Sequence, residues 1–91
     1  MLKITSVGST DQEVTLQLHG RVTGPWVELL RQSAESVLHD ARLTLDLENI
    51  SFIDCEGVGL IKNLIDRGVR QVNAPLFVAE QIKKCTAQQG N

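Results

Sequence analysis

Three side chains that could do chemistry stand together in the segment SFIDCEGVGL, residues 51–60: Asp54, Cys55 and Glu56. A thiol between two carboxylates has the chemical groups of a nucleophilic or acid–base site. Beyond them, apolar residues recur at helical spacing, so the three residues are predicted to lie at the start of a helix. Asp54 is its predicted N-cap, because a carboxylate can accept hydrogen bonds from backbone N–H groups that have no partner within the helix.

The cysteine in this segment is a weak candidate for a reactive group. A thiolate is favoured at a helix N-terminus, but Asp54 and Glu56 flank Cys55 and oppose the negative charge, and no basic residue is adjacent in the sequence. We therefore expect Cys55 to be a small, partly buried residue that fills space, and Cys85 to lie in the core. Their spacing matches no metal site, and reduced thiols are expected.

Other catalytic arrangements are not favoured. Asp54 and Glu56 should point in different directions at a helix start, whereas a glycosidase pair must face across a cleft. His19 and His39 are expected on the surface, away from any nucleophile. The sequence has no phosphate-binding glycine loop and no dinucleotide fingerprint. It therefore predicts a protein that is not an enzyme and that uses no cofactor and no metal.

Composition narrows the class of protein further. The chain has 91 residues, enough for one domain with a modest core, and a net charge of −2. That charge argues against nonspecific binding to nucleic acid, which needs a concentrated basic face. No run of apolar residues is long enough to insert in a membrane, and no signal peptide opens the sequence. We expect a cytoplasmic protein.

Hydrophobic periodicity divides the chain into seven elements. Alternating residues predict strands that begin at Leu2, cover Val14–Leu18 and Leu43–Leu47, and end with a short strand at about Val69–Val72. Apolar stripes predict helices from Pro25 to Ala41, from the Asp54 cap to Gly68, and after Asn73-Ala74-Pro75.

This order of elements predicts an α/β fold in a single small domain. A mixed four-stranded sheet, made of an antiparallel hairpin followed by parallel crossovers, should pack against about three helices. The domain is expected over residues 2–86, and residues 87–91 form a polar C-terminal tail.

The quoted residues also carry a resemblance to a known family. Leu18–Val22 (LHGRV), Leu43–Leu47 (LTLDL) and residues 51–60, with Val72–Pro75 further along, resemble the STAS domain. This family is named after sulphate transporters and antagonists of anti-sigma factors, and the match runs over residues 2–86. The resemblance implies the mixed sheet described above and a role in binding other proteins.

The chain departs from the family pattern at two places. In bacterial antagonists of anti-sigma factors, the second residue after the aspartate is a Ser or Thr that a partner kinase phosphorylates, and the equivalent position here is Glu56. Glutamate has no hydroxyl, so this phosphorylation switch cannot operate, and Ser51 is a poor substitute. Glu56 either partly imitates a phosphoserine or only stabilises the helix start. The chain is also short between Leu64 and Val72, which puts the edge of the sheet in doubt.

Two functions follow from the resemblance. The first is a regulatory adaptor that presents the Gly20–Pro25 loop and the start of the second helix to an anti-sigma, serine-kinase-like protein. The implied contact residues are Arg21, Thr23, Asp54, Cys55, Glu56, Gly57 and Gly59. The alternative is an accessory STAS subunit of a membrane transport complex, which needs no phosphorylation. Self-association through an exposed sheet edge stays open in either case.

Overall fold

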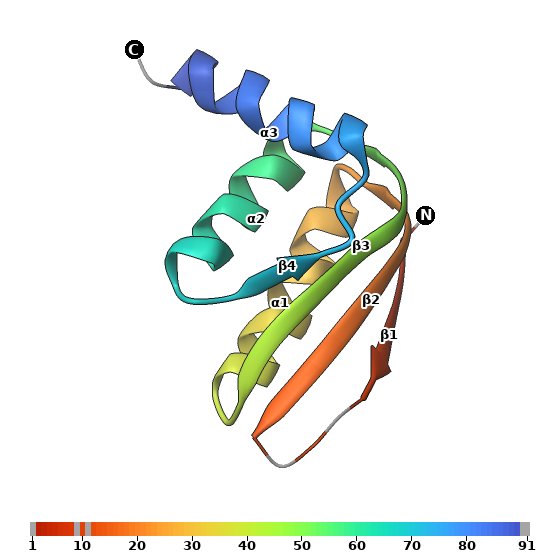
Figure 1. Cartoon of the computed structure of the whole chain (residues 1–91), viewed down its shortest axis with the longest axis vertical. Coiled ribbons are helices and arrows are strands. Elements are labelled where there is room, and N and C mark those ends of the chain that lie inside the picture. Colours follow the sequence, from red (N-terminus) through yellow and green to blue (C-terminus); the bar gives the residue numbers. More distant parts are fainter. Residues whose placement is uncertain (1, 9, 11, 90–91) are drawn as a thin grey trace.

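The computed structural model describes residues 2–8, 10 and 12–89, and side chains only as far as Lys84. The elements are β1 (Leu2–Val7), β2 (Glu13–Val22), α1 (Pro25–Leu38), β3 (Arg42–Ile53), α2 (Cys55–Asp66), β4 (Arg70–Val72) and α3 (Leu76–Gln89). Their order is the predicted one (Figure 1). Helix α3 continues beyond residue 86, where the domain was expected to end. The side chain of Cys85 and residues 90–91 of the expected tail lie outside the described part.

The four strands form one mixed sheet in the order β1-β2-β3-β4, which confirms the predicted fold class. Strand β1 is antiparallel to β2, while β2, β3 and β4 run parallel to one another. Helix α1 connects β2 to β3, and α2 connects β3 to β4 (Figure 1). The carboxyl ends of β2 and β3 and the first turns of α1 and α2 therefore meet at one edge of the sheet.

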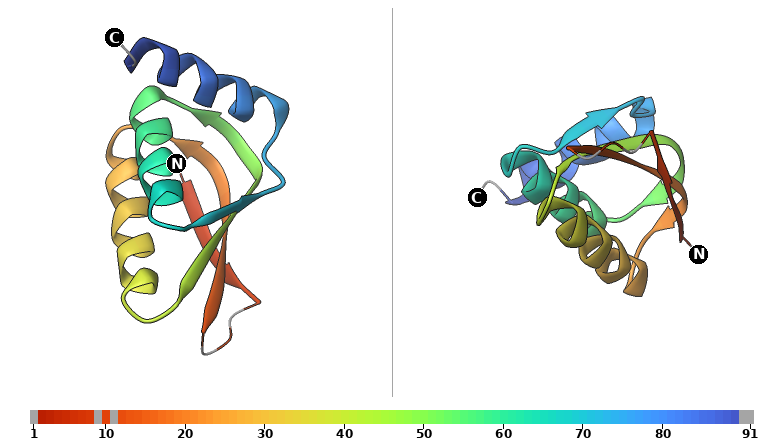
Figure 2. Two further views of the ribbon diagram at one scale, coloured as in Figure 1. Left: turned by 60° about the vertical axis from the view of Figure 1, so that its left-hand side comes forward. Right: turned by 90° about the horizontal axis from the view of Figure 1, so that it is seen from below.

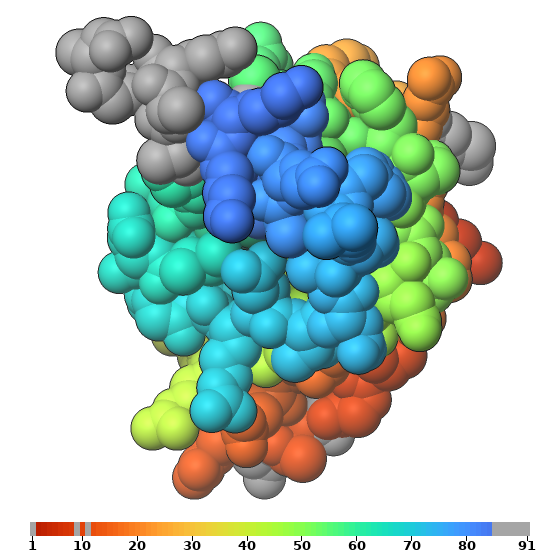
Figure 3. Space-filling view, turned by 45° about the horizontal axis from the view of Figure 1, so that its top comes forward, coloured from red at the N-terminus to blue at the C-terminus, as the bar shows by residue number. Residues whose placement is uncertain are grey.

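The three helices do not cover the sheet equally. Helices α1 and α2 lie side by side on one face of the sheet, and α3 lies across the end of the molecule, against α2 and β3 (Figure 2). The space-filling view shows the start of α3 at this end of the molecule, between the atoms of α2 and those of β3 (Figure 3). The opposite face of the sheet carries half-buried polar side chains such as Thr15, Gln17, Thr44 and Asp46.

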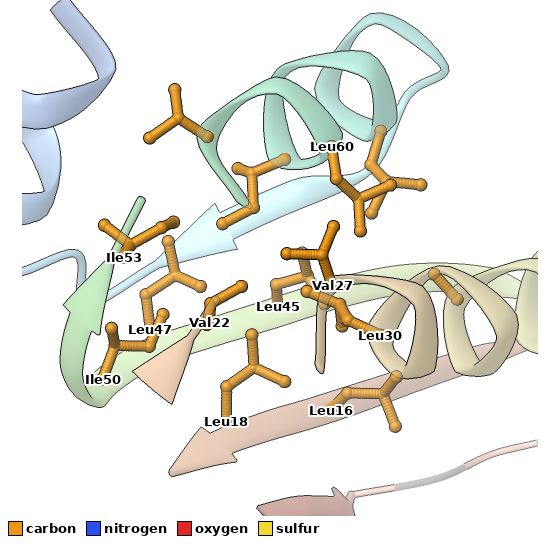
Figure 4. Close-up of a cluster of buried hydrophobic side chains, with 14 of the residues drawn as sticks. Leu16, Leu18, Val22, Val27, Leu30, Leu45, Leu47, Ile50, Ile53 and Leu60 are labelled. Atoms are coloured by element: carbon orange, nitrogen blue, oxygen red, sulfur yellow. The ribbon is translucent and has the colours of Figure 1, made fainter. Parts of the chain in front are cut away.

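The core lies between the sheet and the helices, where alternating strand residues meet the helical stripes (Figure 4). Its buried members include Leu16, Leu18, Leu43, Leu45 and Leu47 from the strands and Val27, Leu30, Ala34, Val58, Ile61 and Leu64 from the helices. Each buried leucine, isoleucine or valine side chain contributes about 1.5–3 kcal/mol, so this layer holds α1 and α2 against the sheet.

Both central strands extend beyond the predicted limits. Strand β3 was expected to stop at Leu47 but continues to Ile53, because Ile50 and Ile53 are also buried at a spacing that strict alternation does not detect. Strand β2 continues to Val22 through a register shift at Gly20, whose φ of 106° suits a β-bulge. The expected Gly20–Pro25 loop is therefore wrong, since only residues 23–24 separate β2 from α1.

The helix limits agree more closely with the sequence pattern. Helix α1 begins at Pro25 as expected but ends at Leu38 rather than Ala41, and a turn follows it. Helix α2 begins directly after Asp54, and Gly68 has the left-handed φ of 95° predicted for its terminator. Strand β4 has only 3 residues, as the shortness of this region indicated.

Candidate functional site

The carboxylate of Asp54 joins the starts of the two helices that cover the sheet. Its Oδ1 accepts a hydrogen bond from the backbone N–H of Gly57 at 2.8 Å, which confirms the predicted N-cap of α2. Its Oδ2 accepts one from the backbone N–H of Gly24 at 3.4 Å, directly before α1. Both oxygens of Asp54 are thus used inside the chain, so this residue holds the site together.

The two glycines of the first turns of α2 have different surroundings. A Cβ added at Gly57 would lie 2.7 Å from the carbonyl oxygen of Val22 and 2.9 Å from Cγ1 of Ile53. Gly57 is buried, and only glycine permits this close approach of α2 to β2. At Gly59 an added Cβ would meet nothing within 4 Å. Gly57 therefore positions the helix, whereas Gly59 leaves open space on its outer side.

The side chain of Glu56 is exposed in the first turn of α2. Within the described part of the chain its carboxylate forms neither an ion pair nor a side-chain hydrogen bond. The helix macrodipole favours a negative charge at this end of the helix. The carboxylate is accordingly open to an approaching molecule rather than hidden in the interior.

The structure corrects the expectations for Cys55. Its side chain is exposed, not partly buried, because the buried stripe of α2 begins only at Gly57. Its sulfur is disulfide-bonded, so the expected reduced thiol is also wrong. Disulfides persist chiefly in oxidising compartments, so this bond gives no support to the expected cytoplasmic location, which stays a prediction.

Arg21 and Thr23 lie near this edge, but the Arg21 side chain faces away from the helices. Adjacent residues in a strand point to opposite faces, and Val22 is buried towards the helices. The Arg21 guanidinium carbon lies 5.6 Å from the ring centroid of Phe52, a cation–π distance, and Phe52 is 45% exposed. Thr23 is half-buried, and its backbone carbonyl accepts from the N–H of Trp26 at 3.0 Å.

A groove of about 520 Å³ runs between α1 and α2, beside Glu56. It is lined by Val27, Arg31, Glu35, Glu56, Gly59, Leu60 and Asn63. The α1 members recur every four residues and the α2 members at three- and four-residue spacing, so each set forms one helix face. Of these residues, only Glu56 and Gly59 were predicted from the sequence to contact a partner.

The charges around the groove are mostly paired within the chain. The Glu35 carboxylate accepts from Nη1 of Arg67 at 2.6 Å and from Nη2 at 2.9 Å. This bidentate hydrogen bond lowers the pKa of Glu35 and raises the pKa of Arg67. Arg31 lies 3.5 Å from Glu28. Glu56 is therefore the charged residue of the groove that has no ion-pair partner among the described residues, and its carboxylate suits a cationic or hydrogen-bond-donating group.

Comparisons with known proteins bear on this architecture. No family model and no curated protein matches the sequence. The solved structure of the anti-sigma factor antagonist SpoIIAA in its unphosphorylated form matches with a TM-score of 0.70. The fold is STAS-like. The match covers 86% of this chain and 79% of that chain at 18% sequence identity, so the likeness establishes the fold alone.

The residues that were expected to contact a partner protein fall into three groups in this structure. Asp54 and Gly57 hold the start of α2 in place by a hydrogen bond and by close packing. Cys55 and Glu56 are exposed there, and Gly59 lines the adjoining groove. Arg21 and Thr23 line no part of this groove.

No helix in the described residues is both long and apolar enough to cross a membrane.

Proposed function

We propose that this chain is a non-enzymatic protein-interaction module whose regulatory role is similar to that of antagonists of anti-sigma factors. The observation that carries the proposal is the exposed carboxylate of Glu56, unpaired among the described residues, in the first turn of α2 of a STAS-like fold. The sequence resemblance assigns this position to the phosphorylated hydroxyl of those antagonists. The proposed partner is an anti-sigma, serine-kinase-like protein.

Glu56 would make this interaction permanent rather than switchable. A phosphoserine carries about −1.5 to −2 charges and three acceptor oxygens, whereas a glutamate carries one charge and two oxygens. The glutamate cannot gain or lose a phosphate group. The module would thus present one fixed acidic contact to its partner at the start of α2.

The outer face of α2 supports close docking of a partner. Glycine inside a helix lowers stability by about 1 kcal/mol relative to alanine. Nothing within the described chain lies within 4 Å of a Cβ at Gly59, so internal packing does not require glycine there. A partner backbone that approaches the groove closely would require it. Glu56 and Gly59 both line that groove, so a single partner segment could contact both.

The second candidate is an accessory subunit of a membrane transport complex. It is favoured by the same glutamate, because a subunit that is never phosphorylated needs no hydroxyl at this position. The two candidates share the contact surface at the start of α2 and differ in the class of the bound protein. Identification of the partner therefore distinguishes them.

The test is affinity capture from the native cell with the parent chain and two single variants. Glu56→Ala removes the exposed groove carboxylate, and Glu80→Ala removes an exposed carboxylate from α3, outside the groove. We expect the parent and the Glu80 variant to capture an anti-sigma, serine-kinase-like protein that the Glu56 variant loses. Capture of a transport ATPase or permease subunit would instead support the second candidate. If the Glu56 variant captures the same partner as the parent, Glu56 has no docking role.

A further inference from the structure

A second cavity, of about 420 Å³, lies at the opposite edge of the sheet, at the amino ends of the parallel strands. It is lined by Glu13, Arg42, Leu43, Thr44, Arg67, Gly68 and Arg70. The three arginines come from the start of β3, the residue after α2 and the start of β4. Arg42 and Arg70 come together because β3 and β4 are parallel and Thr44 stands opposite Arg70 in their register, whereas Arg67 reaches the same cavity from the residue after α2.

The lining of this cavity has an excess of positive charge in a chain whose net charge is −2. Glu13 is the one carboxylate in the lining, and Glu35 neutralises Arg67 from outside it. In the described ranges, neither Arg42 nor Arg70 has an ion-pair partner. Like charges that share a cavity repel one another, and a bound anion would relieve that repulsion.

The available hydrogen-bond donors are side chains rather than the backbone. The N–H of Gly68 already donates to the carbonyl of Ile65 at 3.0 Å, and that of Arg42 donates to Gln12 at 2.9 Å. Glu35 orients the guanidinium of Arg67 through one N–H on each terminal nitrogen. A guanidinium has five N–H donors, so the fixed group of Arg67 keeps others for a second acceptor.

We propose that this arginine cavity, defined by Arg42, Arg67 and Arg70 with Thr44, binds a phosphate-bearing ligand. Planar guanidinium groups bind phosphate oxygens in a bidentate manner, and three of them from separate elements can contact several oxygens of one ligand. The half-buried Thr44 adds a hydroxyl that can donate to the same group. A soluble phosphorylated molecule and the headgroup of an anionic lipid share this chemistry. The proposal is independent of the function assigned to Glu56.

The test uses pyrophosphate as the probe, titrated into isotope-labelled full chain in phosphate-free buffer and followed by backbone amide resonances. We expect saturable shifts at Thr44, Gly68 and Arg70. The double variant Arg42→Gln with Arg70→Gln should bind about tenfold more weakly or worse, since each lost charged hydrogen bond has an effect of that order. Thermal unfolding of the same variant shows that it is folded.

The matched control is the double variant Lys83→Gln with Lys84→Gln, which removes the same charge from exposed positions of α3 outside the cavity. It should bind pyrophosphate as the parent does. A second arm measures co-sedimentation with phosphatidylglycerol vesicles, with phosphatidylcholine vesicles as reference. Cavity-dependent binding to pyrophosphate alone indicates a soluble ligand, and cavity-dependent binding to the anionic vesicles indicates a lipid headgroup. No saturable binding to either probe, or an equal loss in both double variants, overturns the proposal.

Discussion

The start of α2 is acidic and the arginine cavity is basic, and the two surfaces lie at opposite edges of the sheet. At the carboxyl edge, Asp54 uses both oxygens to join the starts of α1 and α2, and the neighbouring carboxylate of Glu56 is exposed. At the amino edge, Glu35 holds Arg67, and neither Arg42 nor Arg70 forms an ion pair with a described residue. In both places the residues that bind one another build the surface, and their unpaired neighbours are the groups available to a ligand.

The same difference appears between two glycines of one helix. Packing within the chain explains why residue 57 is a glycine, because a Cβ there would meet Val22 and Ile53 at less than van der Waals distance. Gly59 has no such neighbour within the described residues. A residue that the fold does not require is a better indicator of binding than one that it does.

The largest expected effect separates these two glycines. Gly57→Ala should destabilise the protein by about 1–3 kcal/mol, because the added methyl group overpacks the contact between α2 and β2. Gly59→Ala is the matched control and should be neutral or stabilising by up to about 1 kcal/mol. Urea denaturation monitored by circular dichroism measures both values. Equal tolerance of the two substitutions would contradict the close approach at Gly57.

The next effect concerns the cap at the carboxyl edge. Asp54→Ala should lower the free energy of unfolding by about 1 kcal/mol, within a range of about 0.5–2, because the N–H of Gly57 loses its acceptor. Asp54→Asn keeps an acceptor oxygen and should lose much less. Chemical denaturation of the three proteins under the same conditions tests this order, and an Asn variant as unstable as the Ala variant would argue against the cap.

The smallest effect belongs to the ion pair beside the groove. Arg67 lowers the pKa of Glu35, so any stabilisation from this pair is present above the ordinary carboxyl pKa and is lost as the pH falls through the lowered value. Both side chains are exposed, and the effect is expected to be slight. Denaturation of the parent and of Glu35→Gln should differ near neutral pH and converge in acid. If the two proteins still differ in stability in acid, packing of the Glu35 side chain, and not its charge, causes the difference.

The sequence predicted the fold through rules that act locally. Alternation, helical stripes, the Asp54 cap and the Gly68 terminator depend on residues close together in the chain, and the structure confirms each of them. Strand β3 exceeded its predicted length because the spacing of its last buried residues breaks the alternation.

The surfaces were less predictable because they join distant segments. The groove requires α1 and α2 to lie side by side, and the arginine cavity requires the register that sets Thr44 opposite Arg70. Neither relation can be seen in a local pattern. The disulfide state of Cys55 could not be deduced from cysteine spacing either.

The most direct test of the central claim measures partner affinity and stability together at Glu56. Once capture has identified the partner, isothermal titration with the parent, Glu56→Ala and Glu56→Gln gives the affinities, and urea denaturation gives the stabilities. We predict that both variants bind about tenfold more weakly or worse, as expected for a lost charged hydrogen bond, while the free energy of unfolding changes by less than about 1 kcal/mol. Affinities equal to that of the parent in both variants would show that the carboxylate only stabilises the start of α2.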